Sequence, residues 1–353
     1  MRVLVTGGEG YIGTVLTSSL VGEGHSVTVL DTGFHRDGHL YTRDQVETCN
    51  IRTDLRRVEP DMLRGFEAVV HLGDLSNDPL SELNADLTVE INHLSAVRLA
   101  QLAKDAGVKR FVYSSSCSVY GASGSESDDL STEETAVAPI TTYATCKVLV
   151  EDALRELSDS TFNTVSLRNA TAFGASPRMR FDLVVNELTA QAFLDRKLVL
   201  TSDGTPWRPF VHVRDIAKAI CCCLSAPPEV VQSEVFNVGD SRTNHQVRDV
   251  CEIIGRVFPD CEVILGDLGD DQRNYRVDFS KITTSLPGYS SDWTVDLGVR
   301  EMYGIFQAIG LTRETLNHRL YRRLMQVTHL LESGQIDSDL FWIEAKKVNP
   351  VDS

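Results

Sequence analysis

The chain has 353 residues, of which 42% are hydrophobic and 24% are charged, so it can bury a large core and is neither disordered nor fibrous. Its formal net charge of -16 opposes attraction to a polyanion, so we expect no nucleic-acid partner. The eight cysteines lack the paired spacing of a zinc site and no apolar run approaches the roughly 18 residues of a membrane span, so we expect no metal, no membrane partner and a cytoplasmic location.

Short apolar runs alternate with helical patterns through the first half of the chain. The chain opens on MRVLVTGG, which reads as a strand and not as a secretory leader. Strands are predicted over residues 2–7, 26–31, 68–73, 110–116 and 164–170, and helices over residues 11–24, 87–107 and from 143 through 157. Because strands that alternate with helices form parallel βαβ units, the predicted fold class is α/β with a doubly wound parallel sheet.

The second half is less regular and predicts a smaller domain made of discontinuous pieces. Residues 210–213 and 235–239 read as strands that return to the main sheet or its edge, and residues 121–135 as a loop. From residue 311 onward the pattern is that of amphipathic helices followed by a loose tail. We therefore expect a nucleotide-binding domain over 1–170, with returning segments near 209–240, and a substrate domain over 171–208 and 241–353.

A glycine triplet marks a candidate dinucleotide site. Gly7, Gly10 and Gly13 follow the first strand and open the first helix, where backbone N–H groups can cradle a pyrophosphate. A tight turn alone would also explain the glycines, but Asp31 ends the second strand about twenty residues on, as the motif requires. Its carboxylate can bind both ribose hydroxyls and would repel a 2′-phosphate, so NAD is predicted over NADP. Asp54 and Leu55 are expected to flank the adenine, although Asp54 could equally be a solvated loop acid.

A tyrosine, a lysine and a serine run form the candidate catalytic set. Among the nine tyrosines only Tyr143 has a lysine four positions later, Lys147, on the same helical face. Ser114 and Ser116 belong to a serine run at the carboxyl end of a strand, the edge where open α/β sheets bind ligands. Lys147, aided by a positive nicotinamide ring, is expected to depress the phenol pKa of Tyr143 so that it acts as a base, while Ser116 orients the reacting oxygen.

The motifs together resemble the extended short-chain dehydrogenase/reductase family, in its NAD-dependent epimerase/dehydratase branch that acts on nucleotide sugars. They occur in the family's order over roughly residues 1 to 300: TGGEGYIG (6–13), Asp31, HLGD (71–74), Asn92, SSSCSVYG (114–121), YATCK (143–147), RPFVHVRD (208–215), FNVG (236–239) and DFSKI (278–282). The resemblance implies a Rossmann domain with a smaller substrate domain, a retained NAD, a nucleotide-diphosphate sugar as substrate and a homodimer.

The resemblance also implies roles for individual residues. It assigns Ser116, Tyr143 and Lys147 to catalysis, with Lys147 also holding the nicotinamide ribose. The implied cofactor-binding residues are Gly7, Gly10, Tyr11, Ile12, Gly13, Asp31, Asp54, Leu55, Leu72, Gly73, Asn92, Ser114 and Lys147. The implied substrate-binding residues are Asp74, Cys117, Ser118, Thr171, Arg180, Asn186, Arg208, Arg273 and Arg276. Arg208 matches a position that contacts the substrate diphosphate, with a surface arginine as the alternative.

Two positions next to the serine run bear on the reaction. The family's dehydratases carry an Asp-Glu pair where this chain has Cys117 and Ser118, and neither side chain is a carboxylic acid. Epimerising members that use a cysteine have it at the position of Ser118, so Cys117 is interpreted as a packing residue. The simplest remaining reaction is epimerisation at C4 through a 4-keto sugar. A 4-ketosugar reductase and a non-catalytic NAD-binding protein are the alternatives.

Departures from the family leave the substrate open. Thr171 stands where asparagine is usual, and the usual downstream arginine is lost, with Arg273 or Arg276 as replacements. Hexoses, uronic acids and heptoses, on any nucleotide, all fit the sequence.

Overall fold

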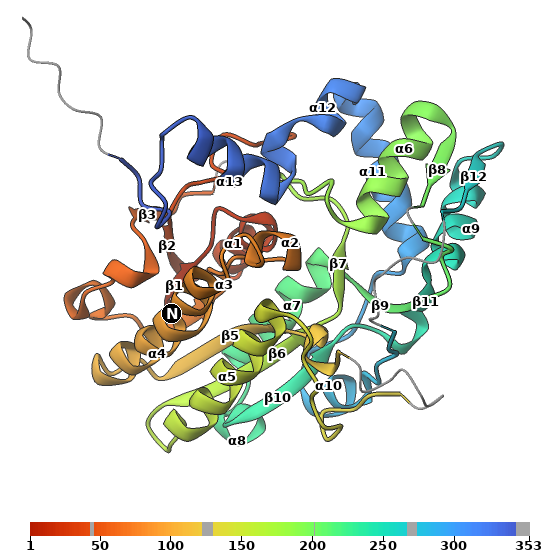
Figure 1. Cartoon of the computed structure of the whole chain (residues 1–353). Coiled ribbons are helices and arrows are strands. Elements are labelled where there is room, and N and C mark those ends of the chain that lie inside the picture. Colours follow the sequence, from red (N-terminus) through yellow and green to blue (C-terminus); the bar gives the residue numbers. More distant parts are fainter. Residues whose placement is uncertain (43–45, 122–129, 201, 267–273, 344–353) are drawn as a thin grey trace, which may run out of the picture.

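A computed structural model describes residues 1–42, 46–121, 130–200, 202–266 and 274–343 (Figure 1). Its main sheet has seven strands in the order β10-β6-β5-β4-β1-β2-β3, and every pairing in it is parallel. The strands are β1 (Arg2–Thr6), β2 (Ser26–Asp31), β3 (Cys49–Arg52), β4 (Ala68–His71), β5 (Arg110–Ser116), β6 (Asn163–Asn169) and β10 (Glu234–Val238). The predicted Rossmann-type parallel sheet is therefore confirmed.

Alternating side chains of the strands build one core on each face of this sheet. Val3 and Val5 of β1 pack with helices α1 (Tyr11–Gly22) and α7 (Val213–Ser225), which contact each other. Leu4, between them in sequence, points to the other face, where α4 (Ser95–Asp105) and α5 (Thr142–Leu157) cover the sheet. Because both faces are buried, the strands are nearly continuous apolar runs, as parallel strands require.

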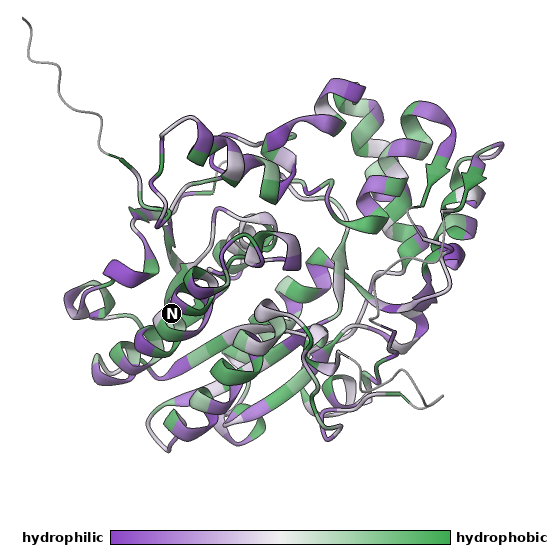
Figure 2. Cartoon of the chain, in the orientation of Figure 1, coloured by the Kyte–Doolittle hydropathy of each residue, from purple (hydrophilic) through white to green (hydrophobic). Residues whose placement is uncertain are grey.

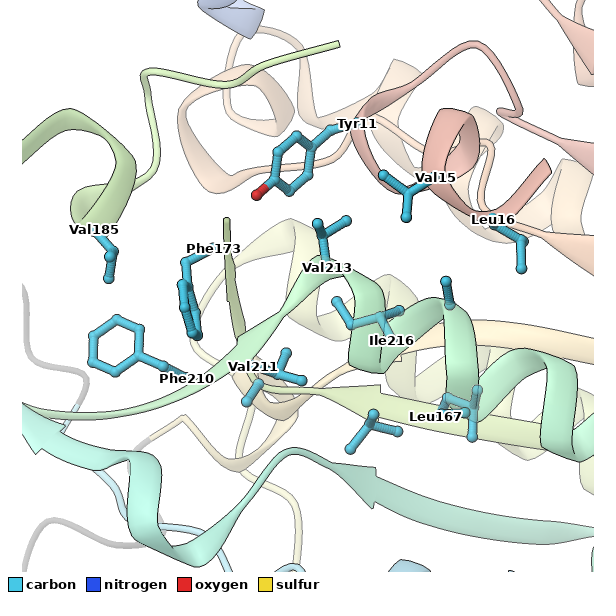
Figure 3. Close-up of a cluster of buried hydrophobic side chains, with 14 of the residues drawn as sticks. Tyr11, Val15, Leu16, Leu167, Phe173, Val185, Phe210, Val211, Val213 and Ile216 are labelled. Atoms are coloured by element: carbon cyan, nitrogen blue, oxygen red, sulfur yellow. The ribbon is translucent and has the colours of Figure 1, made fainter. Parts of the chain in front are cut away.

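The figures show both sides of this arrangement. In Figure 3, Val15 and Leu16 of α1 face Val213 and Ile216 of α7 across the first core. In Figure 2, α4 and α5 carry bands of both hydrophilic and hydrophobic residues, as expected for helices with one face on a core and one in solvent.

The order of the strands reverses between β1 and β4. From β1 the chain runs outward through β2 and β3, and then returns to β4 on the other side of β1. The carboxyl ends of β1 and β4 diverge at this reversal, which is where open α/β sheets bind their ligands. The fold therefore places the binding site beyond β1 and β4.

The second half adds two small sheets and several helices. One sheet has the order β11-β9-β7 and the other pairs β12 with β8. Their strands are β7 (Thr171–Phe173), β8 (Lys197–Val199), β9 (Trp207–His212), β11 (Asn244–Gln246) and β12 (Glu262–Ile264), and the long helices are α6 (Val184–Asp195), α9 (Val247–Val257) and α11 (Val295–Ile309). The prediction for residues 235–239 is confirmed, because β10 pairs with β6. The prediction for residues 210–213 was wrong, because β9 pairs with β7 and β11 and not with the main sheet.

The remaining helices are short, apart from the last one. They are α2 (Asp78–Ser81), α3 (Ala85–Thr88), the π-helical segment η3 (Val89–Leu94), α8 (Pro228–Val231), α10 (Ser280–Ser285), α12 (Arg313–Asn317) and α13 (Arg323–Glu332), with single 3-10 turns at η1 (Leu55–Arg57), η2 (Pro60–Leu63), η4 (Cys117–Tyr120), η5 (Ser241–Thr243) and η6 (Arg319–Tyr321). The helix predicted over 87–107 is thus three consecutive segments. In the described part of the chain, no helix is long and apolar enough to cross a membrane.

The end of the described chain packs on the main domain. Val327 and Leu330 of α13, with Ile336 and Leu340 beyond it, form a third apolar cluster with Phe34 and with residues that follow β4. Ile336 also forms a β-bridge with Trp342, so the chain stays packed beyond α13, and a tail after residue 343 lies outside the described residues. The boundary between the two predicted domains remains a prediction.

Candidate active site

One cavity opens at the carboxyl ends of β1, β2, β4 and β5. Eighteen of the residues predicted for the site line it: Gly7, Gly10, Tyr11, Ile12, Gly13, Asp31, Asp54, Leu55, Leu72, Gly73, Asp74, Ser114, Ser116, Ser118, Tyr143, Lys147, Thr171 and Arg180. The structure therefore brings the predicted cofactor residues and the predicted catalytic residues to one place. The roles of these residues stay predictions.

The glycine turn between β1 and α1 has no room for side chains. Gly7 has φ +70°, and a Cβ on it would lie 2.8 Å from the carbonyl of Leu72. A Cβ on Gly13 would lie 2.4 Å from the carbonyl oxygen of Gly7. Gly10, the residue before α1, has no side chain to bond the first N–H groups of the helix. These N–H groups can therefore bind an anionic group in the cavity.

Asp31 stands at the end of β2 with its carboxylate held by backbone. Its oxygens accept hydrogen bonds from the N–H groups of Gly33, at 2.8 Å, and Glu9, at 3.1 Å. Burial raises the pKa of Asp31, and the hydrogen bond from Gly33 opposes that rise. An acceptor held in this way beside the glycine turn suits a pair of ribose hydroxyls.

Asp54 is bound to a neighbouring arginine. Its carboxylate accepts from the N–H of Arg56 at 2.9 Å and from the Arg56 guanidinium at 2.8 Å. It therefore caps the 3-10 turn η1 and positions Leu55 at the cavity wall, so it is not a solvated loop acid.

Tyr143 and Lys147 come from the first turns of α5. Thr141 caps this helix by accepting a hydrogen bond from the N–H of Ala144, so the helix starts just before Tyr143. The ammonium of Lys147 donates to the carbonyl oxygen of Ser114 at 2.5 Å and lies 5.3 Å from the ring centroid of Tyr143. Ser116 forms a hydrogen bond with the Tyr143 side chain. The three predicted catalytic groups therefore lie close together around Tyr143.

The pKa of Tyr143 differs from the prediction. Burial raises the pKa of Tyr143 above its ordinary value, whereas the Lys147 ammonium and the Ser116 hydrogen bond act to lower it. The lysine thus acts in the expected direction, but burial outweighs it in the protein by itself. The positive charge of a nicotinamide ring would act on Tyr143 in the same direction as Lys147.

Asp74 contacts the catalytic lysine. One carboxylate oxygen lies 2.6 Å from Lys147 Nζ, and the other lies 3.5 Å from Nε2 of His71. His71 Nδ1 is in turn 2.7 Å from Thr6 Oγ1. Burial lowers the pKa of Lys147, but the Asp74 carboxylate, Tyr143 and Glu151 together outweigh it and the pKa is raised. Asp74 lines the cavity and is paired with Lys147, because the turn after β4 brings the two side chains together, and its predicted contact with the substrate stays a prediction.

Cys117 and Ser118 differ in their access to the cavity. The Cys117 thiol is buried, donates to the carbonyl oxygen of Arg168 and has a pKa that burial raises. It lies outside the cavity lining, which agrees with a packing role and not with substrate binding. Ser118 lines the cavity, and its Oγ is buried with no hydrogen-bond partner among the described residues.

Two predicted asparagines serve the framework around the cavity. Asn92 accepts from the N–H of Leu75 at 2.8 Å and donates to its carbonyl oxygen at 3.1 Å, which fixes the segment after β4. Asn186 bonds the N–H of Gly174, the carbonyl of Arg180 and the hydroxyl of Tyr11. Neither side chain is part of the wall that the described residues form, and their predicted contacts with cofactor and substrate stay predictions.

Arg208 lies next to a residue of the cavity wall. Arg208 is only 9% exposed and stands 5.9 Å from the ring centroid of Tyr275, which lines the cavity. It is therefore not a surface arginine. Arg276 stacks over Trp207 at 5.1 Å, and Arg273 falls outside the described residues.

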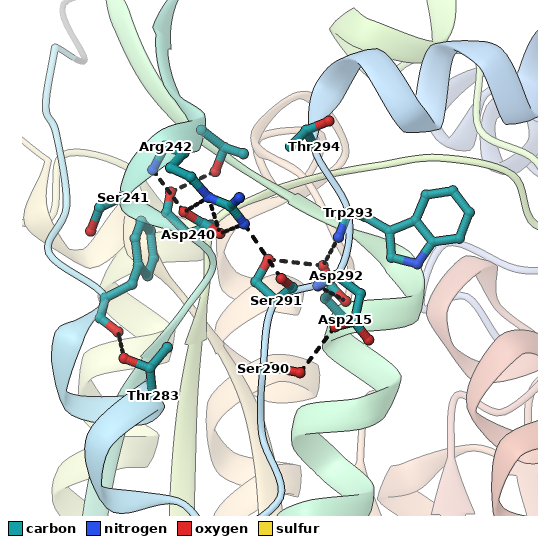
Figure 4. Close-up of polar contacts among 12 residues, drawn as sticks. Asp215, Asp240, Ser241, Arg242, Thr283, Ser290, Ser291, Asp292, Trp293 and Thr294 are labelled. Atoms are coloured by element: carbon teal, nitrogen blue, oxygen red, sulfur yellow. Dashed lines mark hydrogen bonds and ion pairs between the residues drawn. The ribbon is translucent and has the colours of Figure 1, made fainter.

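Asp215, the last residue of the RPFVHVRD motif, is hydrogen-bonded to the segment before α11. Asp215 accepts hydrogen bonds from the Ser291 hydroxyl and from the N–H groups of Asp292 and Trp293, at 3.1 to 3.2 Å (Figure 4). It anchors the segment before α11, away from the cavity.

Sequence reasoning missed a wall of the cavity. Phe34 and His35, after β2, and Arg323 and Val327, in α13, line it together with the glycine turn. Phe34 could have been suspected from its position near Asp31. Nothing in the sequence pattern links α13 to the second strand.

Comparison with known proteins finds a family and several relatives. Residues 3–239 match the model of a family described as the NAD dependent epimerase/dehydratase family. The UDP-glucose 4-epimerase of Lactobacillus helveticus is 29% identical over 261 residues, which cover 68% of this chain and 76% of that protein.

Two solved structures share the fold. MoeE5 in complex with UDP-glucuronic acid and NAD is 26% identical, with a TM-score of 0.74 and coverage of 87% of this chain and 99% of that chain. TunA, an NAD dependent NDP-hexosamine 5,6-dehydratase, is 26% identical, with a TM-score of 0.76 and coverage of 87% and 98%.

Proposed function

Because the chain belongs to the NAD dependent epimerase/dehydratase family, we propose that it is an NAD-dependent nucleotide-sugar 4-epimerase, an isomerase that inverts C4 through a 4-keto sugar. The observation that carries the proposal is that Ser116, Tyr143 and Lys147 meet in the cavity that also contains the glycine turn and Asp31. The similarity to UDP-glucose 4-epimerase supports the reaction.

The cavity fits NAD. The turn at Gly7 and Gly13 leaves backbone accessible where a side chain would clash, as a diphosphate requires. Asp31 would bind the adenosine ribose, and Lys147 would hold the nicotinamide ribose. NAD held there would supply hydride transfer from and to the sugar carbon.

The side chains of this protein would handle the proton and the position of the sugar. Tyr143 removes the proton of the C4 hydroxyl as the C4 hydride leaves, and returns it after the keto sugar has presented its other face. Ser116 donates a hydrogen bond to the reacting oxygen. Lys147 favours the phenolate of Tyr143 by its charge, and the positive charge of the bound cofactor adds to that effect.

The surroundings of the catalytic set favour epimerisation over dehydration. Elimination of water needs an acid and a base beside the ketone. Cys117 is buried with a raised pKa, and Ser118 carries no ionisable group at neutral pH. TunA is a dehydratase of similar fold, so the distinction rests on these side chains and not on the fold.

The substrate class and the setting complete the proposal. The similar protein from Lactobacillus helveticus is a UDP-glucose 4-epimerase and MoeE5 binds UDP-glucuronic acid, so we propose a UDP-hexose or a UDP-hexuronic acid as substrate. We further propose a cytoplasmic homodimer that serves carbohydrate biosynthesis, as the family resemblance implies. Size-exclusion chromatography with light scattering tests the dimer.

The decisive experiment is incubation with single UDP-sugars, without added NAD, followed by NMR of the sugar protons. The expected result is a mixture of two C4 stereoisomers of unchanged mass, and no reaction with the Tyr143→Phe protein. A product lighter by one water would identify a dehydratase. Net consumption of added NADH with a 4-keto sugar would favour the reductase.

A further inference from the structure

Three buried arginines gather where the segment after β7 meets α13. Arg178, Arg180 and Arg323 are 4%, 7% and 4% exposed. Arg180 is paired with Asp182 through two contacts of 2.9 and 3.1 Å. Within the described residues, the guanidinium groups of Arg178 and Arg323 have no hydrogen-bond or ion-pair partner. Two buried guanidinium groups therefore form no ion pair with the described residues.

The three arginines concentrate positive charge in a small buried region. Burial, followed by the repulsion of Arg180, lowers the pKa of Arg323 to about 9. His35 lies beside all three arginines, and burial together with their charges holds its pKa well below the ordinary value, so it stays neutral. The other carboxylates that face the arginines are Asp31, Glu9 and Asp37, and none of them forms an ion pair with Arg178 or Arg323.

Isolated buried charges are costly, so a cluster of this kind indicates a missing anion. Arg180 and Arg323 line the cavity together with Gly10 and Gly13. Arg323 acts electrostatically on Asp31, and Arg180 acts on Tyr143. The two guanidinium groups thus line the same cavity as the carboxylate proposed for the adenosine ribose and the proposed catalytic tyrosine, and each acts electrostatically on one of these two groups. In a bound dinucleotide the diphosphate lies between the adenosine ribose and the nicotinamide end.

We infer that Arg323, supported by Arg178 and Arg180, binds the diphosphate of NAD. Helix α13 would then add a side chain to a cofactor site that the glycine turn forms from backbone. This inference rests on the proposed function. Its chemistry is charge-assisted hydrogen bonding of guanidinium to phosphate oxygens.

Hydrogen bonds hold the C-terminal part of the described chain next to Asp31, as a contact between Arg323 and the cofactor requires. The side chain of Gln326 in α13 donates to the carbonyl oxygen of Phe34 at 2.8 Å. The indole N–H of Trp342 donates to the carbonyl oxygen of Thr32 at 2.7 Å. Both acceptors belong to the segment that follows β2. The position of Arg323 at the cavity is therefore fixed by α13 and by the residues beyond it.

The test compares Arg323→Gln with Arg322→Gln, its neighbour in sequence, whose guanidinium is paired with Glu187 at 2.8 Å. Cofactor-free protein is titrated with NAD by calorimetry, and its melting temperature is measured with and without NAD. We expect Arg323→Gln to bind NAD about tenfold to hundredfold more weakly. Its melting temperature without NAD should be unchanged or higher, because an uncompensated charge is removed. Arg322→Gln should melt slightly lower and bind NAD as the wild type does.

The outcomes separate this inference from the proposed function. A lower melting temperature of Arg323→Gln with unchanged NAD affinity would make Arg323 a structural residue and overturn the inference. Weaker binding of UDP-glucose with unchanged NAD affinity would assign the arginines to the diphosphate of the sugar nucleotide instead. A wild-type protein that binds NAD but inverts no sugar would refute the proposed epimerase and leave the cofactor contact standing.

Discussion

The ammonium of Lys147 lies 2.6 Å from a carboxylate oxygen of Asp74, and both side chains are 4% exposed. The charge of the lysine is therefore balanced before any ligand arrives. Because Asp74 also raises the pKa of Tyr143, it weakens the effect of Lys147 on the phenol. The strength of the proposed base is thus set by a pair of opposite charges and not by the lysine alone.

Replacing Asp74 by asparagine should move the whole pH profile to lower pH. Tyr143 must lose its proton to act as a base, and without the Asp74 charge its pKa falls, so activity rises at lower pH. Lys147 must keep its proton, and without Asp74 burial lowers its pKa, so activity also falls earlier at high pH. We expect both limbs of the kcat/KM profile to shift by roughly one pH unit. Asp86→Asn, at an exposed site, is the control, and an unshifted profile would contradict the argument.

Tyr143→Phe should abolish turnover and leave the fold intact. The substitution removes the proton acceptor and almost no volume from a buried position. Loss of a general base costs about 10²- to 10⁴-fold in rate. The variant should keep its circular dichroism spectrum and its NAD content. A residual kcat above roughly a tenth of the wild type would contradict a general-base role of this size.

Asp31→Ala should weaken NAD binding and narrow the preference over NADP. The carboxylate is oriented by the N–H groups of Gly33 and Glu9, so its loss removes a fixed acceptor and a charge that repels a 2′-phosphate. Calorimetric titration of the wild-type and variant proteins with both cofactors measures the change. Equal affinity of the wild type for NAD and NADP would contradict the proposed role of Asp31 in excluding a 2′-phosphate.

Residues at the ends of strands could be predicted from the sequence, whereas contacts between distant segments could not. Gly7, Asp31 and Ser116 each follow an apolar run, and parallel strands bring such positions to one edge. Arg323 reaches the same cavity because α13 packs beneath the segment after β2, and no local periodicity encodes that packing. The apolar run at 210–213 would suit a strand in either sheet, so the sequence could not predict which strands pair with it. For Asp74, the sequence indicated a position at the site but not the partner.

The last prediction concerns where deuterium goes. If no acid or base stands beside the ketone, then the carbons next to C4 never lose a proton. Cys117 is bound to the carbonyl of Arg168 with a raised pKa, and Ser118 is not ionisable at neutral pH, so neither can enolise the keto sugar. A reaction run in D2O should therefore leave C3 and C5 unlabelled, as read by NMR and mass spectrometry. A substrate deuterated at C4 should keep its label in the product, because the hydride leaves and returns within one active site. Deuterium at C3 or C5 would show enolisation and identify a 3,5-epimerase or a dehydratase instead.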